Sequence, residues 1–147
     1  MSRRNLCRLV LVGFALALMV GSASAISTFF SVQGRIDSFS FPAFPGFPGF
    51  DGPANTEMVG LTLKPGDVIP WHYHQGPAYV IVSRGTLTED DGCGQVRQFR
   101  AGSAFGEEPG HVHQVSNQGH GVVVLYFAAV YPANSEDAIF VDGPNCP

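Results

Sequence analysis

The stretch from Gly66 to Gly85 constrains the chain more than any other, because it places two histidines two residues apart inside a run typical of β-strands. Side chains at positions i and i+2 point to the same face of a strand, so His72 and His74 can reach one point. A metal ion needs that convergence. The two end glycines fit turns that bound this run. The alternative for an isolated H-x-H pair is a solvated strand face that carries two histidines by chance.

A second stretch, residues 102–117, supplies a third histidine. The two stretches together resemble the two sequence motifs of the cupin superfamily, G-x5-H-x-H-x3-E-x6-G and G-x5-P-x-G-x2-H-x3-N. The matching positions are Gly66, His72, His74 and Gly85 in the first motif and Gly102, Gly110, His113 and Asn117 in the second. The resemblance covers roughly residues 57–130. It implies an all-β, single-domain cupin barrel, which is a double-stranded β-helix or jelly roll.

The resemblance also implies a divalent transition metal as cofactor, with His72, His74 and His113 as its ligands. Neutral imidazole suits zinc, iron, copper and nickel, and the sequence does not choose among these metals and manganese. The alternative is a metal-free cupin whose histidines line a wet polar pocket.

Two departures from the motifs concern the fourth ligand. Ala78 stands where the family usually has a ligand glutamate, and Glu108 stands at the proline of the second motif, with Pro109 next to it. The residues near the third histidine that could replace the glutamate are Glu107, Glu108 and His111. We favour three histidines completed by solvent, with Glu107 as the first candidate for an added carboxylate. The alternative for each of these residues is a solvated loop side chain.

Other polar and aromatic residues near the motifs have more ordinary interpretations. Asn117 matches the second motif, and its amide is expected to hold the turn or to support a ligand from outside the coordination sphere. Trp71 and Tyr73 lie on the strand face opposite His72, so they are expected to pack. His120, between two glycines, is expected in a turn.

The N-terminal segment has the pattern of a cleaved signal peptide. Three arginines at positions 3, 4 and 8 precede an apolar run over residues 9–20, and Ala23-Ser24-Ala25 follows it. This order predicts cleavage after Ala25, and the apolar run is short for a membrane-spanning helix. Residues 2–8 also resemble the twin-arginine export consensus. The sequence therefore predicts export to a bacterial periplasm or beyond, without stable membrane insertion after cleavage.

Charge and size limit the partners. The chain has 12 acidic and 8 basic side chains, and cleavage would remove three of the basic ones. No basic patch remains, which argues against nucleic acid or an anionic membrane as partner. Residues 26–147 suffice for one domain. Dimers are common among cupins, so the resemblance also implies a homodimer.

Two cysteines, Cys93 and Cys146, remain after the predicted cleavage. An even pair in an oxidising compartment predicts an intramolecular disulfide that pins the C-terminal tail to the barrel. The alternatives are free thiols or bonds to other chains.

The rest of the chain divides into a Phe/Pro/Gly-rich N-terminal arm over residues 26–55, the barrel over 56–131 and a tail over 132–147. Strand signals begin after Asn55. The expected strands are Glu57–Lys64, Val68–Tyr73, Ala78–Ser83, Thr86–Glu89, Val96–Arg100, Ser103–Gly106, Val112–Ser116 and Val122–Val130. Ser38–Gly52 is expected to be extended and polyproline-like, because repeated proline denies backbone donors. Its phenylalanines would cover the barrel wall or mouth, or else form a lid or an arm that docks on another subunit.

Two functions remain open from these residues. The first is a metal-dependent enzyme, for example of dioxygenase type, acting on a small organic substrate, with Glu107 or Glu108 available for proton transfer. The second is a non-catalytic barrel that binds a sugar or an organic acid. The retained histidines favour the enzyme, and the lost glutamate favours the binding barrel.

Overall fold

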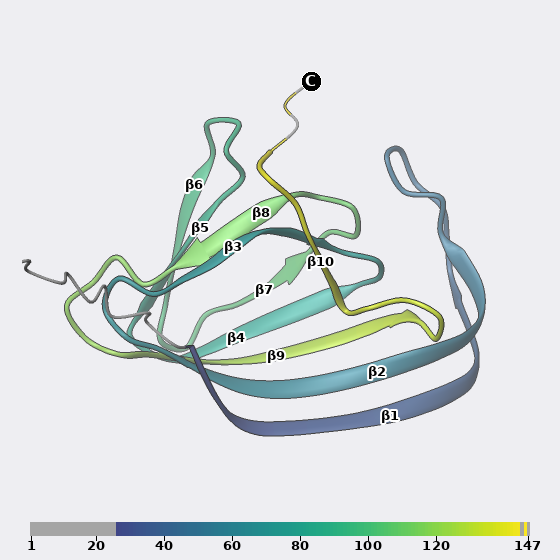
Figure 1. The fold of residues 1–147 in the computed structure, drawn as a ribbon, viewed down its shortest axis with the longest axis horizontal. Helices are drawn as coiled ribbons and strands as arrows, with labels where there is room; N and C mark the ends of the chain where they lie inside the picture. The colour runs from purple at the N-terminus through teal and green to yellow at the C-terminus, as the bar shows by residue number, and fades with distance from the viewer. Residues whose placement is uncertain (1–25, 145, 147) are drawn as a thin grey trace, which may run out of the picture.

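The computed structural model describes residues 26–144 and residue 146. The predicted signal peptide lies outside these residues. The described chain is all-β, as predicted, with ten strands in two five-stranded antiparallel sheets that face each other (Figure 1). The first sheet has the order β1 (Ser27–Phe41), β2 (Phe50–Leu63), β9 (Val123–Pro132), β4 (Ala78–Arg84) and β7 (Ala104–Glu107). The second has the order β10 (Ala138–Phe140), β3 (Val68–His74), β8 (His113–Ser116), β5 (Thr86–Asp90) and β6 (Val96–Arg100).

The hydrophobic core lies between the two sheets, because the strands bury alternate side chains. Along β4, Val80 and Val82 are buried whereas Tyr79 and Ile81 are exposed. The same alternation of buried and less buried side chains runs along β9. The core includes Leu63, Val82, Leu87, Val123, Leu125, Phe127 and Tyr131. Each side chain of this size stabilises the fold by about 1.5–3 kcal/mol when fully buried. The second sheet turns its histidines toward this interior.

Every strand expected from the sequence is present, with ends shifted by at most two residues, except that β2 begins at Phe50 rather than at Glu57. The expectation that strands begin only after Asn55 was wrong, because β1 and the first half of β2 precede that residue. They form one long hairpin that continues the first sheet. The periodicity of β1 is weak in the sequence because β1 is an edge strand, exposed over most of its length on both faces.

The Phe/Pro-rich segment forms the tip of this hairpin. Pro42, Pro45 and Pro48 fall in the connection, outside both strands, where their missing N–H groups break no ladder. The polyproline-like expectation therefore fails for the ends of β1 and β2, which are paired strands. The phenylalanine rings contact one another, with centroids 5.4 Å apart for Phe44 and Phe47 and 6.0 Å for Phe41 and Phe47.

The tail crosses back to the barrel. A hydrogen bond of 3.0 Å from the backbone N–H of Ser135 to the carbonyl of Pro132 closes a turn after β9. The next element, β10, pairs with β3. The sequence patterns did not predict β10. The predicted disulfide between Cys93 and Cys146 is present. Within the described residues, no helix is long and apolar enough to cross a membrane.

Candidate metal centre

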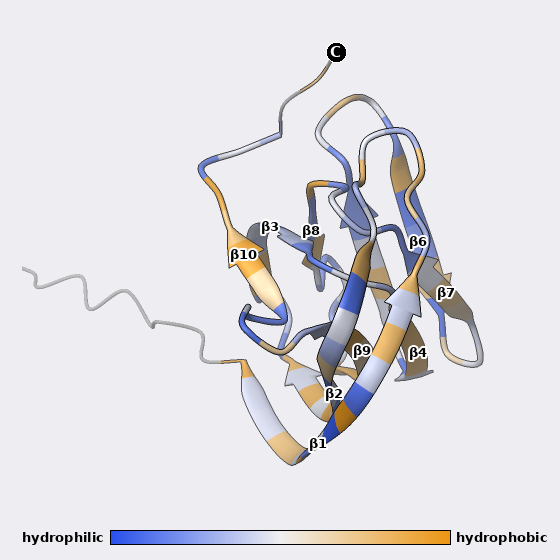
Figure 2. Cartoon of the chain, turned by 90° about the vertical axis from the view of Figure 1, so that its right-hand side faces the viewer, coloured by the Kyte–Doolittle hydropathy of each residue, from blue (hydrophilic) through white to orange (hydrophobic). Residues whose placement is uncertain are grey.

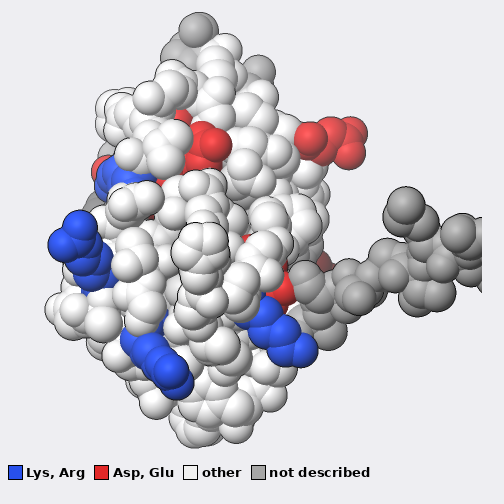
Figure 3. Space-filling view, turned by 90° about the vertical axis from the view of Figure 1, so that its left-hand side faces the viewer, with Lys and Arg blue, Asp and Glu red and all other residues white. Residues whose placement is uncertain are grey.

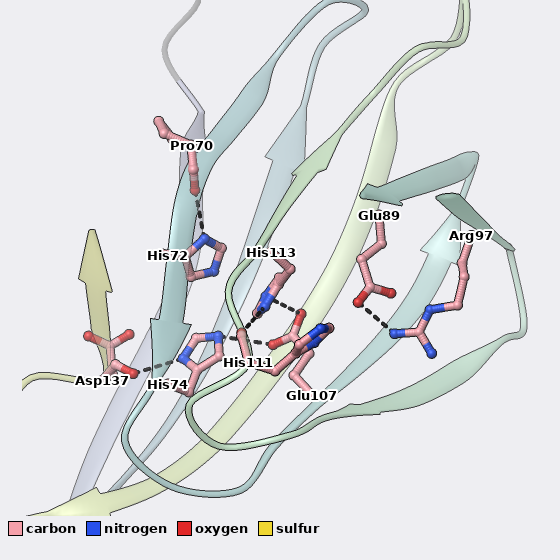
Figure 4. A network of polar contacts seen from close by, with 9 residues as sticks. All are labelled: Pro70, His72, His74, Glu89, Arg97, Glu107, His111, His113 and Asp137. Atoms are coloured by element: carbon pink, nitrogen blue, oxygen red, sulfur yellow. Dashed lines mark hydrogen bonds and ion pairs between the residues drawn. The ribbon is translucent and has the colours of Figure 1, made fainter. Parts of the chain in front are cut away.

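Two strands of the second sheet bring three histidines together. His72 and His74 share the inner face of β3, and His113 begins β8 directly opposite His72 in the ladder. All three side chains are buried, and one ring nitrogen of each lies within 4.8 Å of the others (Figure 4). The convergence expected from the H-x-H spacing and the third histidine is therefore present.

Backbone carbonyls fix the orientation of all three rings. The Nδ1–H groups of His72, His74 and His113 donate to the carbonyl oxygens of Pro70, Asp137 and His111, at 2.7, 2.8 and 2.9 Å. A carbonyl oxygen can only accept, so each Nδ1 carries a proton. The lone pair of each neutral imidazole is then on Nε2. This is how proteins orient metal-binding histidines.

A carboxylate reaches the same point from the first sheet. Glu107 ends β7 and is paired directly with Ala78 of β4. Its two carboxylate oxygens lie 3.0 Å from Nε2 of His74 and 3.2 Å from Nε2 of His113. Residues opposite each other in a ladder have Cβ atoms about 5 Å apart. Glu107 therefore places a carboxylate beside the position where the cupin motif has its glutamate.

Burial and mutual charge set the protonation of this cluster. Burial lowers the pKa of His72 to about 4, and the neighbouring His113 acts in the same direction. Burial alone would raise the pKa of Glu107, but the close contacts of its carboxylate with His113 and His74 outweigh burial and hold that pKa at about 2. The pKa of His113 is raised, because its contact with Glu107 outweighs burial. The site thus holds an ionised carboxylate against imidazoles at neutral pH.

The chemistry of these donors fits a transition-metal ion. Among the described residues, Nε2 of His74, Nε2 of His113 and Oε2 of Glu107 are buried without a hydrogen bond of good geometry, although they lie within ion-pair distance of one another. Buried polar atoms without hydrogen-bond partners destabilise the folded state. A cation bound by imidazole nitrogens and a carboxylate oxygen would satisfy them together.

The remaining candidate residues lie elsewhere. The side chains of His111 and Glu108 are exposed, and His111 contributes its carbonyl rather than its ring. Asn117 is buried, and its amide bonds Leu63 O, Gly121 O and Gly119 N. These bonds hold the turn between β8 and β9, one of its two expected roles.

Sequence reasoning missed two contributors. The Asp137 carbonyl belongs to a tail without pattern, so no local signal pointed to it. Glu89 is buried on β5, 2.6 Å from Arg97 of β6. Those two residues are paired across the hairpin that turns at Gly92, so counting outward from that turn would have found them.

A cavity of about 180 Å³ adjoins the histidines. Its walls are mostly aliphatic and aromatic, and its polar side chains are few. The lining includes His72, His74, Glu107, Ile69, Val115, Phe127 and Phe140. An apolar cavity of about 150 Å³ in another protein admits benzene, so this one has room for a small organic molecule.

Two facing sheets with a buried histidine cluster on the inner face of one of them define a double-stranded β-helix protein with a pocket beside that cluster. The family model of the cupin domain matches residues 61–129. This part of the chain is a cupin domain, and the motif-based prediction is confirmed.

Solved structures show the same fold. A cupin-like protein from Thermotoga maritima aligns with a TM-score of 0.51 at 20% identity, over 58% of this chain and 64% of that one. The polyketide cyclase RemF from Streptomyces resistomycificus aligns with a TM-score of 0.50 at 15% identity, over 59% and 62%. A conserved protein with a double-stranded β-helix domain from Klebsiella pneumoniae has 28% identity and a TM-score of 0.48, over 55% and 70%. The chain thus spans just under two thirds of the first two structures, and these likenesses concern the fold. No curated protein sequence matches the chain.

Proposed function

We propose that the chain binds one divalent transition-metal ion through Nε2 of His72, His74 and His113, with Glu107 as a fourth ligand. The observation that carries this proposal is the set of three buried imidazoles whose Nδ1–H groups are already bonded to carbonyls. The contacts of Glu107 with two of these rings support its assignment. In a hypothetical metal-free role, the buried cluster would leave its acceptor atoms unsatisfied.

The activity that best suits this site is that of a metal-dependent enzyme acting on a small, largely apolar molecule. A bound metal would supply Lewis acidity or, if redox-active, oxygen chemistry of the dioxygenase type. Ile69, Val115 and Phe127 form walls that exclude water and hold the apolar part of a substrate beside the histidines. Glu107 offsets positive charge there and is the carboxylate placed to receive a substrate proton.

A non-catalytic binding barrel is the second candidate, and the small number of proton-transfer groups in the cavity favours it. The missing glutamate at position 78 no longer favours this candidate, because Glu107 supplies a carboxylate beside the histidines. No Lys or Arg lines the described cavity, so an organic acid would meet no cationic side chain. The apolar walls also offer few partners for sugar hydroxyls.

The first test is metal analysis of the chain from residue 26, purified without chelator or affinity metal. We expect close to one ion of iron, manganese, copper, nickel or zinc per chain, and loss of that ion in His113→Ala with the fold retained. Persistent absence of metal after reconstitution would contradict the proposal. Incubation of the loaded protein with small aromatic and phenolic compounds, followed by mass spectrometry, separates the two candidates. An enzyme converts a compound, whereas a binding barrel returns it unchanged.

We also propose that the protein is exported. The N-terminal pattern of a basic segment, an apolar run and small residues supports export. The disulfide supports an oxidising compartment as well. N-terminal sequencing of the secreted or periplasmic product should begin at Ile26.

A further inference from the structure

The C-terminal strap, which we define as residues 137–144 with Cys146, lies outside the residues matched by the cupin family. It nevertheless borders the metal site. β10 pairs with β3 so that Ala138 lies opposite His74 and Phe140 lies opposite His72. Three strap residues, Asp137, Ala138 and Phe140, line the cavity. The strap is therefore a wall of the site.

One histidine depends on the strap for its orientation. His72 and His113 donate to carbonyls only two residues away along their own segments. His74 instead donates to Asp137, which lies 63 residues away in the sequence. Figure 4 shows Asp137 approaching the His74 ring from the side away from Glu107. Correct placement of the His74 ring thus requires that the strap stays docked.

A short strand at one end and the disulfide at the other hold the strap on the barrel. β10 has three residues at the edge of its sheet, and a backbone hydrogen bond of 3.0 Å runs from Val141 N to Trp71 O. A strand of three residues contributes little by itself to holding the strap in place. The disulfide fixes the far end to Cys93. That anchor is firm, because Asp91 accepts hydrogen bonds from the backbone N–H groups of Cys93 and Gln95 and so braces the hairpin turn.

We propose that the disulfide-anchored strap is a functional part of the metal site, because it holds the Asp137 carbonyl against His74 and so positions that ligand. The inference rests on the proposed metal site. Groups that hold metal ligands typically change metal affinity by about 10–100-fold when they are lost. Loss of the Cys93–Cys146 bond should therefore weaken metal binding by a factor in this range, although neither cysteine contacts the metal position.

The experiment compares the chain from residue 26 with its Cys93→Ser/Cys146→Ser double variant. Zinc affinity is measured by competition with a chromophoric chelator. Exchange of the three imidazole Nδ1–H protons with solvent is followed by NMR in ¹⁵N-labelled protein. We expect weaker zinc binding and fast exchange at His74, with His72 and His113 still protected. A merely structural loss of stability would affect all three protons alike.

A second variant keeps the test decisive if the double variant fails to fold. Val141→Pro removes the N–H that bonds Trp71 and leaves the disulfide in place, whereas Val141→Ala is its matched control and keeps that N–H. The proline variant should reproduce the selective exposure of His74, and the alanine variant should not. Unchanged zinc affinity and a protected His74 proton in the folded variants would overturn the proposal.

The two proposals can also fail separately. If the unmodified chain binds no zinc, the proposed function is contradicted. The His74 proton can still be followed in the metal-free protein, where it should be protected only while the strap is docked. Protection that persists in both strap variants would contradict the strap inference whatever the metal result.

Discussion

At the scale of single residues, the carboxylate that we propose as a metal ligand lies on β7, opposite the β4 position where the cupin motif has its glutamate. Ala78 and Glu107 face each other across the β4–β7 ladder and are both buried. The methyl group of Ala78 leaves room for the longer side chain beside it. A glutamate at both positions would place two carboxylates within a few ångströms, which disfavours ionisation of both.

This pairing predicts the outcome of a carboxylate exchange. Glu107→Ala should weaken zinc binding by about 10–100-fold, and adding Ala78→Glu to it should recover a large part of the loss. Ala78→Glu alone should lower the melting temperature, because it buries a second acidic group next to Glu107. Chelator competition and thermal unfolding measure these effects. Failure of the double variant to bind better than Glu107→Ala would contradict the assignment of Glu107 as a ligand.

The pKa of His72 predicts how acid affects the metal-free protein. Its folded pKa of about 4 lies below the ordinary 6.5. Between pH 4 and pH 6.5, His72 therefore binds a proton in the unfolded chain but not in the folded one. The free energy of unfolding should therefore fall as the pH drops from 6.5 to 4, by at most about 1.4 kcal/mol per pH unit from this group. The depressed pKa of Glu107 acts in the same direction at lower pH, and the raised pKa of His113 acts against it.

Urea unfolding of the chelator-treated protein at several pH values measures this dependence. His72→Gln should flatten the decrease between pH 6.5 and pH 4, because glutamine does not titrate. An unchanged slope in this variant would mean that other groups cause the acid sensitivity.

Residue spacing explains why the sequence brought the three histidines together and offered Glu107 only as a candidate to join them. His72 and His74 are two residues apart on one strand, so local geometry alone places them together. Glu107 comes close to them only because the β4–β7 ladder pairs residue 107 with residue 78. Such long-range register depends on the packing of the whole sheet. The sequence could therefore offer Glu107 as a candidate without deciding for it.

At the scale of elements, the strands with alternating patterns were predictable and the terminal ones were not. β1 is exposed on both faces and β10 has three residues, so neither shows the period of a half-buried strand. Pairing with β2 and β3, rather than local preference, makes them strands. Figure 2 shows that β10 is predominantly apolar, which suits its place over the cavity.

The turn between β3 and β4 offers a test of how tightly the His74 end of the site is packed. A Cβ atom at Gly76 would collide with the carbonyl of Val130 on β9. Gly76→Ala should therefore lower the free energy of unfolding by about 1–3 kcal/mol, as overpacked sites do. Gly121→Ala is the matched control, because nothing lies within 4 Å of its Cβ position. Denaturant unfolding distinguishes them, and equal stability of the two variants would contradict this packing.

At the scale of the whole molecule, the charges are sparse and scattered. In the view of Figure 3, Lys and Arg side chains lie apart from one another among uncharged atoms. That face carries no basic patch.

The outer face of the first sheet is uncharged over two neighbouring rows. Residues that lie opposite each other in neighbouring strands form the rows. The first row is Val32, Met58, Ala128, Tyr79 and Gly106, and the second is Gly60, Tyr126, Ile81 and Ala104. Tyr79 and Ile81 are 61% and 52% exposed. The Phe29 ring packs over Gly60 and against Tyr126. A stable interface buries roughly 800 Å² per partner, so an interface here would need most of this face.

We therefore expect two copies of the chain to pack through this face, which gives the homodimer expectation a location. We choose a second copy because the face offers no charge for a charged partner and a twofold interface places the same surface of both copies together. Light scattering at increasing concentration should show a dimer for the unmodified chain and a monomer for Ile81→Lys/Tyr126→Lys, because lysines facing each other across the axis repel. Val96→Lys, at a 59% exposed position on β6 of the other sheet, should remain dimeric. A monomer for the unmodified chain at every concentration would contradict the expectation, and the exposed face would then be available to a different partner.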